Sequence, residues 1–169
     1  MKTESIEIKP ATLGSISQGT LGTEDLLSAF ISELEWQVSR NGDYFSRPEN
    51  FGDRDKLANL IGDAQDCFAE EDGNEIDESK EDEASELVNE TLMDALNSFA
   101  GPYCYFGSHE GDGSDFGYWP SMSEIEELPT YESTDAATEA GEENDYKVVS
   151  DHGNVEIYSA SGESILGIV

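Results

Sequence analysis

The stretch SKEDEASELVNETLMDALNSFA, residues 79–100, decides the fold class of this chain. Its apolar residues recur every three or four positions, which is the period of one helix face. Gly101 and Pro102 follow at once, a pair that ends helices. We therefore expect a helix from about Ser79 to Phe99. Its wide apolar face would comprise Ala84, Leu87, Val88, Thr91, Leu92, Ala95, Leu96 and Phe99.

Two further helices are predicted before this one. Thr23 is a suitable N-cap for the first, which should run until Asn41 and Gly42 stop it. Asp53 is a suitable cap for the second, which should end near Glu70. The buried stripe of the first helix would comprise Leu27, Phe30, Ile31, Leu34 and Val38, and that of the second Leu57, Leu60, Ile61, Ala64 and Phe68.

The period changes from helical to β after Pro102. Five short runs rich in aromatic and β-branched residues follow, separated by Gly-rich or acidic loops. They are 103–106, 116–119, 146–150, 155–159 and 165–169. Helices first and strands second indicate an α+β fold, with about three helices packed on one small C-terminal antiparallel β-sheet.

A length of 169 residues predicts a single domain over 1–169. We divide it into an N-terminal strand or loop (1–22), a helical part (23–100) and a β part (103–169). Ile6 and Ile8 alternate with charged residues, as in a short edge strand or an ordered tail, and a loop should follow to Gly22. Nine of the sixteen residues 130–145 are Glu, Asp or Thr, which predicts a mobile acidic loop there.

The charge of the chain is extreme. Thirty-nine Asp and Glu oppose eight Lys and Arg, for a net charge of -31. From Leu57 onward only Lys80 and Lys147 are basic, whereas Arg40, Arg47, Arg54 and Lys56 lie close together before it. Such a charge excludes DNA, RNA and anionic membranes as direct ligands and favours a basic partner.

The sequence also predicts a cytoplasmic protein. Two cysteines do not form a disulfide framework. Met1 to Pro10 lacks the apolar run of a signal peptide, and no stretch approaches the length of a membrane span. The oligomeric state stays open, with a dimer among the alternatives.

One feature of the predicted third helix calls for a functional explanation. Its acidic residues recur at intervals of four, although like charges at this spacing destabilise a helix. We call Glu78, Asp82, Glu86, Glu90 and Asp94 the acidic row. Four helical residues rise about 6 Å, which is similar to the spacing of phosphates along a nucleic-acid strand. Since a turn takes 3.6 residues, each step should drift by about 40° and the row should wind across the exposed face.

We therefore predict that this face binds a basic nucleic-acid-binding protein of a host by presenting carboxylates in place of phosphates. The row and its neighbours must share one face to reach the charge density of duplex DNA. The predicted contacts are Glu75, Asp77, Glu78, Asp82, Glu86, Glu90 and Asp94, with Glu70, Glu71, Asp72, Glu124, Glu126 and Glu127 as a rim. No enzymatic activity, metal or cofactor is expected.

In composition the chain resembles the small acidic inhibitors that phages and plasmids deploy against restriction and CRISPR systems, many of which imitate DNA. This resemblance implies anti-restriction or anti-CRISPR action in the cytoplasm of a host cell. Separately, the runs YCYFG (103–107), EGDGSDFG (110–117) and DHGNV (151–155) resemble short uncharacterised proteins of phages and actinobacteria. That resemblance implies a phage or mobile-element origin and no particular activity.

Other interpretations remain open. An acidic surface also keeps proteins of salt-loving organisms soluble. The loop from His109 to Asp115 offers oxygen ligands for a cation, although it does not match the calcium-loop pattern and is simpler as a hairpin loop. Cys104 with His109 or His152 would resemble a thiol–imidazole pair, but a cysteine between aromatic residues is typical of a buried strand.

Two expectations concern local structure. Residues 151–154, DHGN, have the chemistry of a tight hairpin turn. We expect Trp36, Tyr118 and Trp119 to anchor the core. The alternative is that Tyr118 or Trp119 is exposed and contacts a partner.

Overall fold

The computed structural model describes residues 7–69, 73 and 75–168. Contacts between Cα atoms divide the chain into two compact units. The first unit comprises Met1–Gly101 and Phe106–Trp119, and the second comprises Pro102–Tyr105 and Pro120–Val169. Each has its own buried side chains, and the prediction of one domain stays a prediction.

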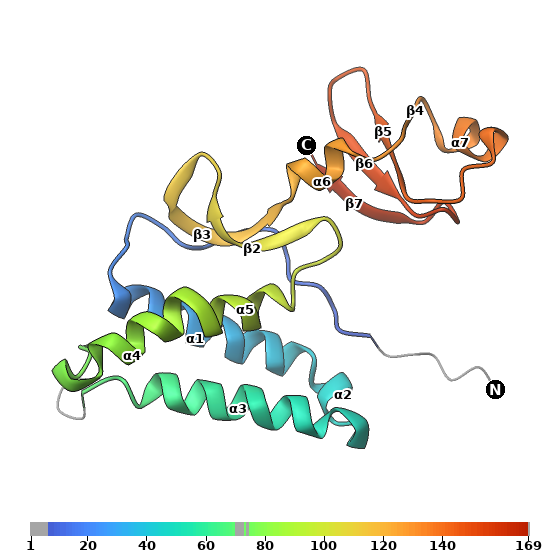
Figure 1. Cartoon of the computed structure of the whole chain (residues 1–169). Helices are drawn as coiled ribbons and strands as arrows, with labels where there is room; N and C mark the ends of the chain where they lie inside the picture. The colour runs from blue at the N-terminus through green and yellow to red at the C-terminus, as the bar shows by residue number, and fades with distance from the viewer. Residues whose placement is uncertain (1–6, 70–72, 74, 169) are drawn as a thin grey trace. The chain divides into compact units, whose positions relative to one another are not determined.

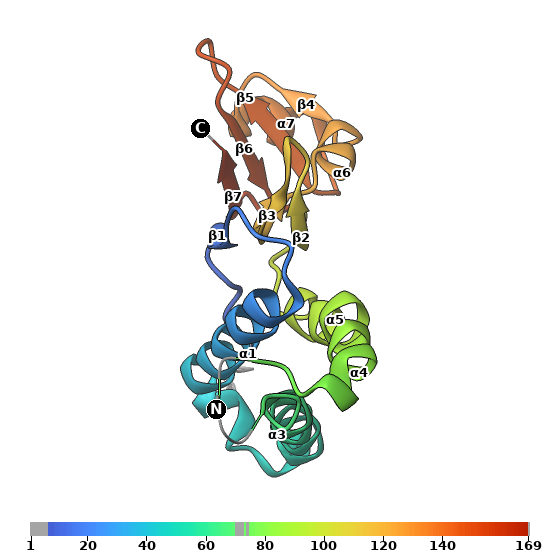
Figure 2. The ribbon, with the colours of Figure 1, turned by 90° about the vertical axis from the view of Figure 1, so that its left-hand side faces the viewer.

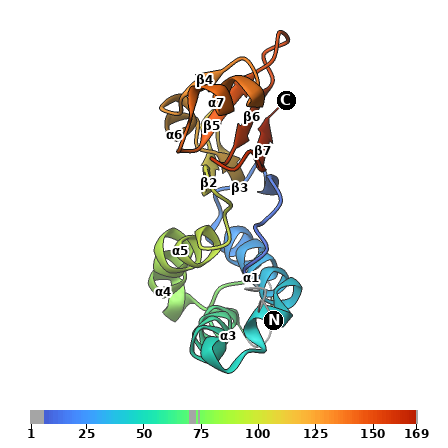
Figure 3. The same ribbon diagram turned by 90° about the vertical axis from the view of Figure 1, so that its right-hand side faces the viewer.

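The fold is α+β, as predicted, but with more helices than three. In the first unit α1 packs against α3, α4 and α5 (Figures 1 and 3). The helical elements of this unit are α1 (Thr23–Arg40), α2 (Gly42–Phe45), the 3₁₀ turn η1 (Pro48–Asn50), α3 (Phe51–Gln65), the 3₁₀ turn η2 (Glu78–Lys80), α4 (Glu81–Glu86), the π turn η3 (Leu87–Thr91) and α5 (Leu92–Asn97).

The predicted helices are present with corrected ends. Gly22, not Thr23, is the N-cap of α1. Asn50, not Asp53, precedes α3, because Pro48 starts a 3₁₀ turn just upstream. Helix α3 ends at Gln65 rather than near Glu70, because the chain turns back to form a bridge between Phe68 and Ile76.

The expectation of one sheet is wrong, because the strands form two. The sheet that lies mostly in the first unit has the order β1-β3-β2, from β1 (Gly14–Ser17), β2 (Cys104–His109) and β3 (Asp112–Pro120) (Figure 2). β1 lies within the Gly/Ser/Thr run predicted as a loop, since pairing with the distant β3 and not local propensity makes it a strand. Gly117 permits this pairing, because a Cβ atom there would lie 2.1 Å from the carbonyl oxygen of Gly14.

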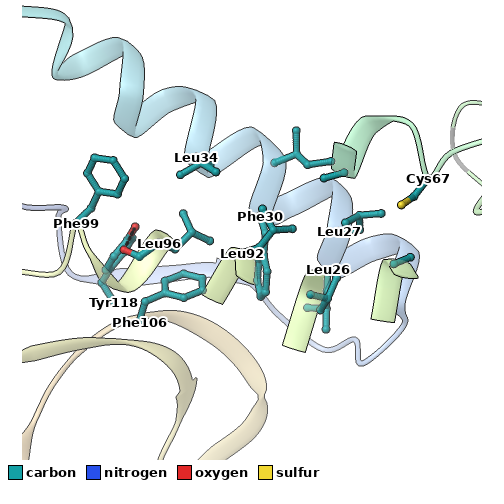
Figure 4. Close-up of a cluster of buried hydrophobic side chains, with 14 of the residues drawn as sticks. Leu26, Leu27, Phe30, Leu34, Cys67, Leu92, Leu96, Phe99, Phe106 and Tyr118 are labelled. Carbon is teal, nitrogen blue, oxygen red and sulfur yellow. Dashed lines mark hydrogen bonds between the residues drawn. The ribbon is translucent and has the colours of Figure 1, made fainter. Parts of the chain in front are cut away.

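Aromatic side chains join the helices of the first unit to its sheet (Figure 4). The ring of Phe30 on α1 lies edge-on to Phe106 and Phe116, with centroids 5.1 and 5.7 Å away. Tyr118 is buried as expected, and its hydroxyl donates to the Leu96 carbonyl at 3.3 Å. Trp36, however, is 60% exposed and anchors nothing in the core, because it lies off the apolar stripe of α1.

Asn41 ties the N-terminal segment to α1. Its side-chain oxygen accepts from the Lys9 backbone N–H at 2.7 Å, and its amide nitrogen donates to the Gln37 carbonyl at 2.9 Å. Asn41 itself is 2% exposed, and its bond to Gln37 is buried while its bond to Lys9 is partly buried. Of the predicted edge strand, Ile6 lies outside the described residues, and residues 7–13 form no strand.

The second unit contains the other sheet, of order β4-β5-β6-β7. Its strands are β4 (Thr130–Tyr131), β5 (Tyr146–Val149), β6 (Val155–Tyr158) and β7 (Ser164–Ile168), and its helices are α6 (Met122–Glu126) and α7 (Thr134–Ala140). Ile125, Ala137, Tyr146 and Ile157 are buried. The predicted hairpin turn at 151–154 is confirmed, with Gly153 at φ 85° between β5 and β6.

The mobile acidic loop predicted for 130–145 is wrong, since this segment forms β4 and α7. β4 pairs with β5 in parallel, and a parallel pair needs a crossover connection, which here contains α7. The side chain of Ser133 caps the helix by accepting from the Ala136 N–H, and Gly141 ends it at φ 72°. Caps therefore order a segment whose composition alone suggests disorder.

Candidate partner-binding face

The acidic row follows the exposed side of the helical segment from η2 to α5. Its members are all exposed, as are Glu75 and Asp77 just before it. The residues at the same interval on the opposite side, Ala84, Val88, Leu92 and Leu96, are at most 3% exposed. The acidic row and the fully buried residues therefore lie on different sides of this segment.

The π turn η3 changes how the row runs. In an α-helix each step of four residues drifts by about 40° in one sense. A π turn closes i→i+5 hydrogen bonds and so holds more residues per turn, which reverses the drift of the same step. Leu87–Thr91 lies in the middle of the row, so the drift expected of one continuous α-helix is interrupted there. The row instead stays opposite the buried stripe.

No ion pair between described residues involves the row. Within the described part of the chain the ion pairs are Arg47–Glu49 and Lys56–Asp53, both away from it. Lys80 donates to the Asp66 backbone carbonyl at 2.8 Å instead of to a carboxylate. Lys147 likewise donates to the carbonyls of Ile125 and Glu126, at 2.8 and 2.9 Å, near the end of α6. Both lysines after Leu57 thus bind backbone oxygens.

An acidic hollow of about 600 Å³ adjoins the start of the row. Glu75, Glu78 and Asp82 line it together with Glu24, from the first turn of α1, and Glu81. Sequence reasoning did not select Glu24, because an acid in a first turn is explained by the helix dipole. The packing of α1 against α4 brings Glu24 to the hollow, and no pattern in the sequence indicates this contact.

Asp77 is held in place locally. Its carboxylate accepts from the hydroxyl and the backbone N–H of Ser79, at 2.6 and 2.8 Å. These bonds, the hydroxyl first, lower the pKa of Asp77 below its usual range. Asp77 therefore remains charged in mildly acidic solution.

The predicted rim is only partly described. Glu124 and Glu126 lie on α6 and Glu127 follows it, all exposed and all in the second unit. Glu70, Glu71 and Asp72 lie outside the described residues. Glu75, Glu78 and Asp82 line one hollow of the first unit, whereas Asp77 lines another with Asp66 and Lys80. One shared face for all the contacts, and its rim, stay predictions.

Two acidic residues near His109 are engaged in hydrogen bonds, some local and one to β1. Asp112 accepts from the hydroxyl and N–H of Ser114, and Asp115 from the Ser15 hydroxyl. The turn lies at Glu110 and Gly111, so 112–115 belong to β3 and not to the predicted loop. Over residues 7–69, 73 and 75–168, no three His, Cys, Asp or Glu side chains are grouped to hold a metal ion.

Cys104 lacks the environment of a nucleophile. It is half-buried on β2, and burial, with a smaller effect of Glu124, raises the pKa of its thiol. A raised pKa favours the protonated thiol, whereas nucleophilic attack requires the thiolate.

Trp119 is half-buried; its ring lies 4.7 Å from that of His109, and its Nε1 donates to the Gly107 carbonyl.

No family model, curated protein or solved structure matches the chain. Among the described helices, none combines the length and the apolar character that crossing a bilayer requires.

Proposed function

We propose that this chain is a phage-type inhibitor that mimics DNA. Its acidic face would occupy the basic nucleic-acid-binding groove of a host defence complex, such as a CRISPR effector or a restriction enzyme. The interaction is competitive and non-enzymatic, and it takes place in the host cytoplasm.

One observation carries this proposal: the carboxylates of the row are exposed together and have no basic partner among the described residues. A row arranged for stability would alternate Glu with Lys. Here the repulsion remains, and Lys80 is directed to a carbonyl. An incoming arginine or lysine therefore finds carboxylates that are not already engaged in ion pairs.

The field of the chain supports the same partner. A large charge of one sign accelerates association with a groove of the opposite sign, and the affinity falls as salt screens it. Each exposed charge contributes about 0.2–1 kcal/mol, so no single residue is essential.

A pair of variants with equal charge tests the location of the binding face. The first variant replaces the seven carboxylates Glu75, Asp77, Glu78, Asp82, Glu86, Glu90 and Asp94 by their amides. The matched control neutralises seven other exposed carboxylates that take part in none of the described side-chain bonds: Asp43, Asp55, Asp63, Glu132, Glu139, Glu143 and Asp151.

The immobilised chain should capture a nucleic-acid-binding protein from host lysate, and duplex DNA should elute it. Once that protein is purified, wild type should compete with fluorescent DNA for it. The concentration needed to displace the DNA should rise at least about tenfold for the first variant. For the control it should stay within about threefold of wild type. Equal losses in both variants, or capture of no DNA-binding protein, would refute mimicry by this face.

A second candidate function is solubility in strong salt. Exposed carboxylates also occur outside the row, on α3, α7 and β6. A halophilic protein would be poorly folded below molar salt, whereas the proposed inhibitor should melt cooperatively in dilute buffer and gain only modestly from salt. Thermal melts over a salt series distinguish the two.

A further inference from the structure

A second surface of the first unit has features that neither the acidic row nor core packing explains. It is a hollow of about 240 Å³ between β1 and α1. The strand side is formed by residues 12–16, and the helix side by Glu33, Trp36, Gln37 and Arg40. None of these residues belongs to the proposed DNA-mimicking face.

Gln37 is the first unusual feature. Its side chain is 1% exposed, and its Nε2 donates to Glu33 at 2.6 Å. Since a carboxylate only accepts, this bond fixes which end of the amide is nitrogen. The Oε1 atom is then left buried with no donor among the described residues. A buried acceptor without a partner is costly, so it calls for a donor from outside.

The other groups around the hollow complement that acceptor. Arg40 forms no ion pair with any described residue, so its guanidinium is available as a donor. Trp36 offers an indole ring that is 60% exposed. Acceptor, donor and aromatic surface together match a peptide group and a neighbouring side chain better than a simple cation or anion, because Glu33 and Arg40 carry opposite charges.

β1 supplies the remaining element. It is the edge strand of its sheet and pairs only with β3 among the described strands. An edge strand leaves a row of backbone donors and acceptors open to another strand. Addition of a strand at such an edge is a common mode of peptide recognition.

We propose that the β1 edge and the Trp36–Gln37–Arg40 hollow bind an extended segment of a partner polypeptide. The segment adds as a strand beside β1, donates one backbone N–H to Gln37 Oε1 and accepts from Arg40. A side chain of the segment packs on Trp36. Because the chain carries a net charge of -31, the segment is one with lysine or arginine. This inference does not depend on the proposed function.

The test uses the full chain and a capped eight-residue peptide that alternates lysine and threonine. The control peptide has the same charge but carries N-methyl groups on its four central amides, which removes their donors. Binding is measured by isotope-edited NMR in 0.3 M salt to reduce non-specific attraction. We expect the amide signals of 14–17 to shift, and the control peptide to bind about tenfold more weakly.

Two protein variants sharpen the test. Gln37→Met keeps the length of the side chain and removes the unpaired oxygen, so it should raise the melting temperature and weaken peptide binding about fivefold. Trp36→Ala changes an exposed side chain and should leave folding intact while weakening binding to a similar degree. Glu35→Gln, on the same helix but not lining the hollow, should bind like wild type.

Three results would overturn the inference. The first is absence of binding at millimolar peptide, in which case the hollow holds solvent only. The second is equal binding of both peptides, or shifts confined to residues 75–94, which would indicate charge attraction alone. The third is slower hydrogen exchange of the amides of residues 14–17 when the protein is concentrated without peptide. A second copy of the chain would then be the occupant.

Discussion

The contact between α1 and β1 and the exposed face of α4–α5 use polar groups in opposite ways. Around α1, single groups at single positions matter: Asn41 holds Lys9, and Gly117 lets β1 approach. On α4–α5 a set of equivalent carboxylates is exposed and forms no ion pair with any residue that the structure describes. In the first region the effect of a residue on stability should depend on its exact position. In the second, the effect on binding should depend on how many carboxylates are present.

The largest effect is expected at Gly117. Gly117→Ala places a Cβ 2.1 Å from the Gly14 carbonyl oxygen, so β1 must separate from β3. Unfolding in denaturant should show a loss of about 3 kcal/mol or more. Gly113→Ala on the same strand meets no atom within 4 Å and should change stability by less than about 0.5 kcal/mol. Equal effects of the two variants would contradict the importance of this close approach.

The next effect is expected at Asn41. Asn41→Ala leaves the Lys9 N–H without its acceptor and removes one of the donors to the Gln37 carbonyl. This should lower the free energy of unfolding by about 1–3 kcal/mol. Hydrogen exchange at the Lys9 amide should accelerate in the same variant. Asn89→Ala, which removes an exposed bond to Ser85, should have a far smaller effect on stability. An exchange rate at the Lys9 amide equal to that of wild type would show that Asn41 does not hold the N-terminal segment.

The smallest effect per residue is expected in the row. Replacing Asp82, Glu86, Glu90 and Asp94 by amides removes the four like-charge pairs of the row, which should stabilise the chain by about 1 kcal/mol in low salt. Each single replacement should change stability by only a few tenths, and 1 M salt should abolish most of the gain. Melting curves of the four single variants and the quadruple variant measure this. A quadruple variant less stable than wild type would show that the row supports the fold.

The sequence predicts the three main helices because their apolar period is local and repeats over many residues. It predicts the acidic row for the same reason. It does not predict α7, β1 or the exposure of Trp36. Segment 130–145 has few large apolar residues, β1 is a strand only through pairing, and no local period shows which aromatic side chains lie outside the core.

The candidate sites divide in the same way. The five acidic residues of the row could be selected from spacing, since residues four apart on a helix share a face, and Glu75 and Asp77 from the crowding of acidic residues just before the helix. Glu24, beside the acidic hollow, and Gln37, with its unpaired oxygen, could not, because each depends on an element far away in the chain.

By itself the sequence determined the excess of negative charge and where it lies along the chain, because charge is a sum over residues. Only the tertiary structure decided that Lys80 and Lys147 bind carbonyls and that, among the described residues, the carboxylates of the row form no ion pair. The physical reason is that neutralisation depends on which groups meet within a few ångströms. Such meetings between distant segments arise from packing and leave no periodic signal in the sequence.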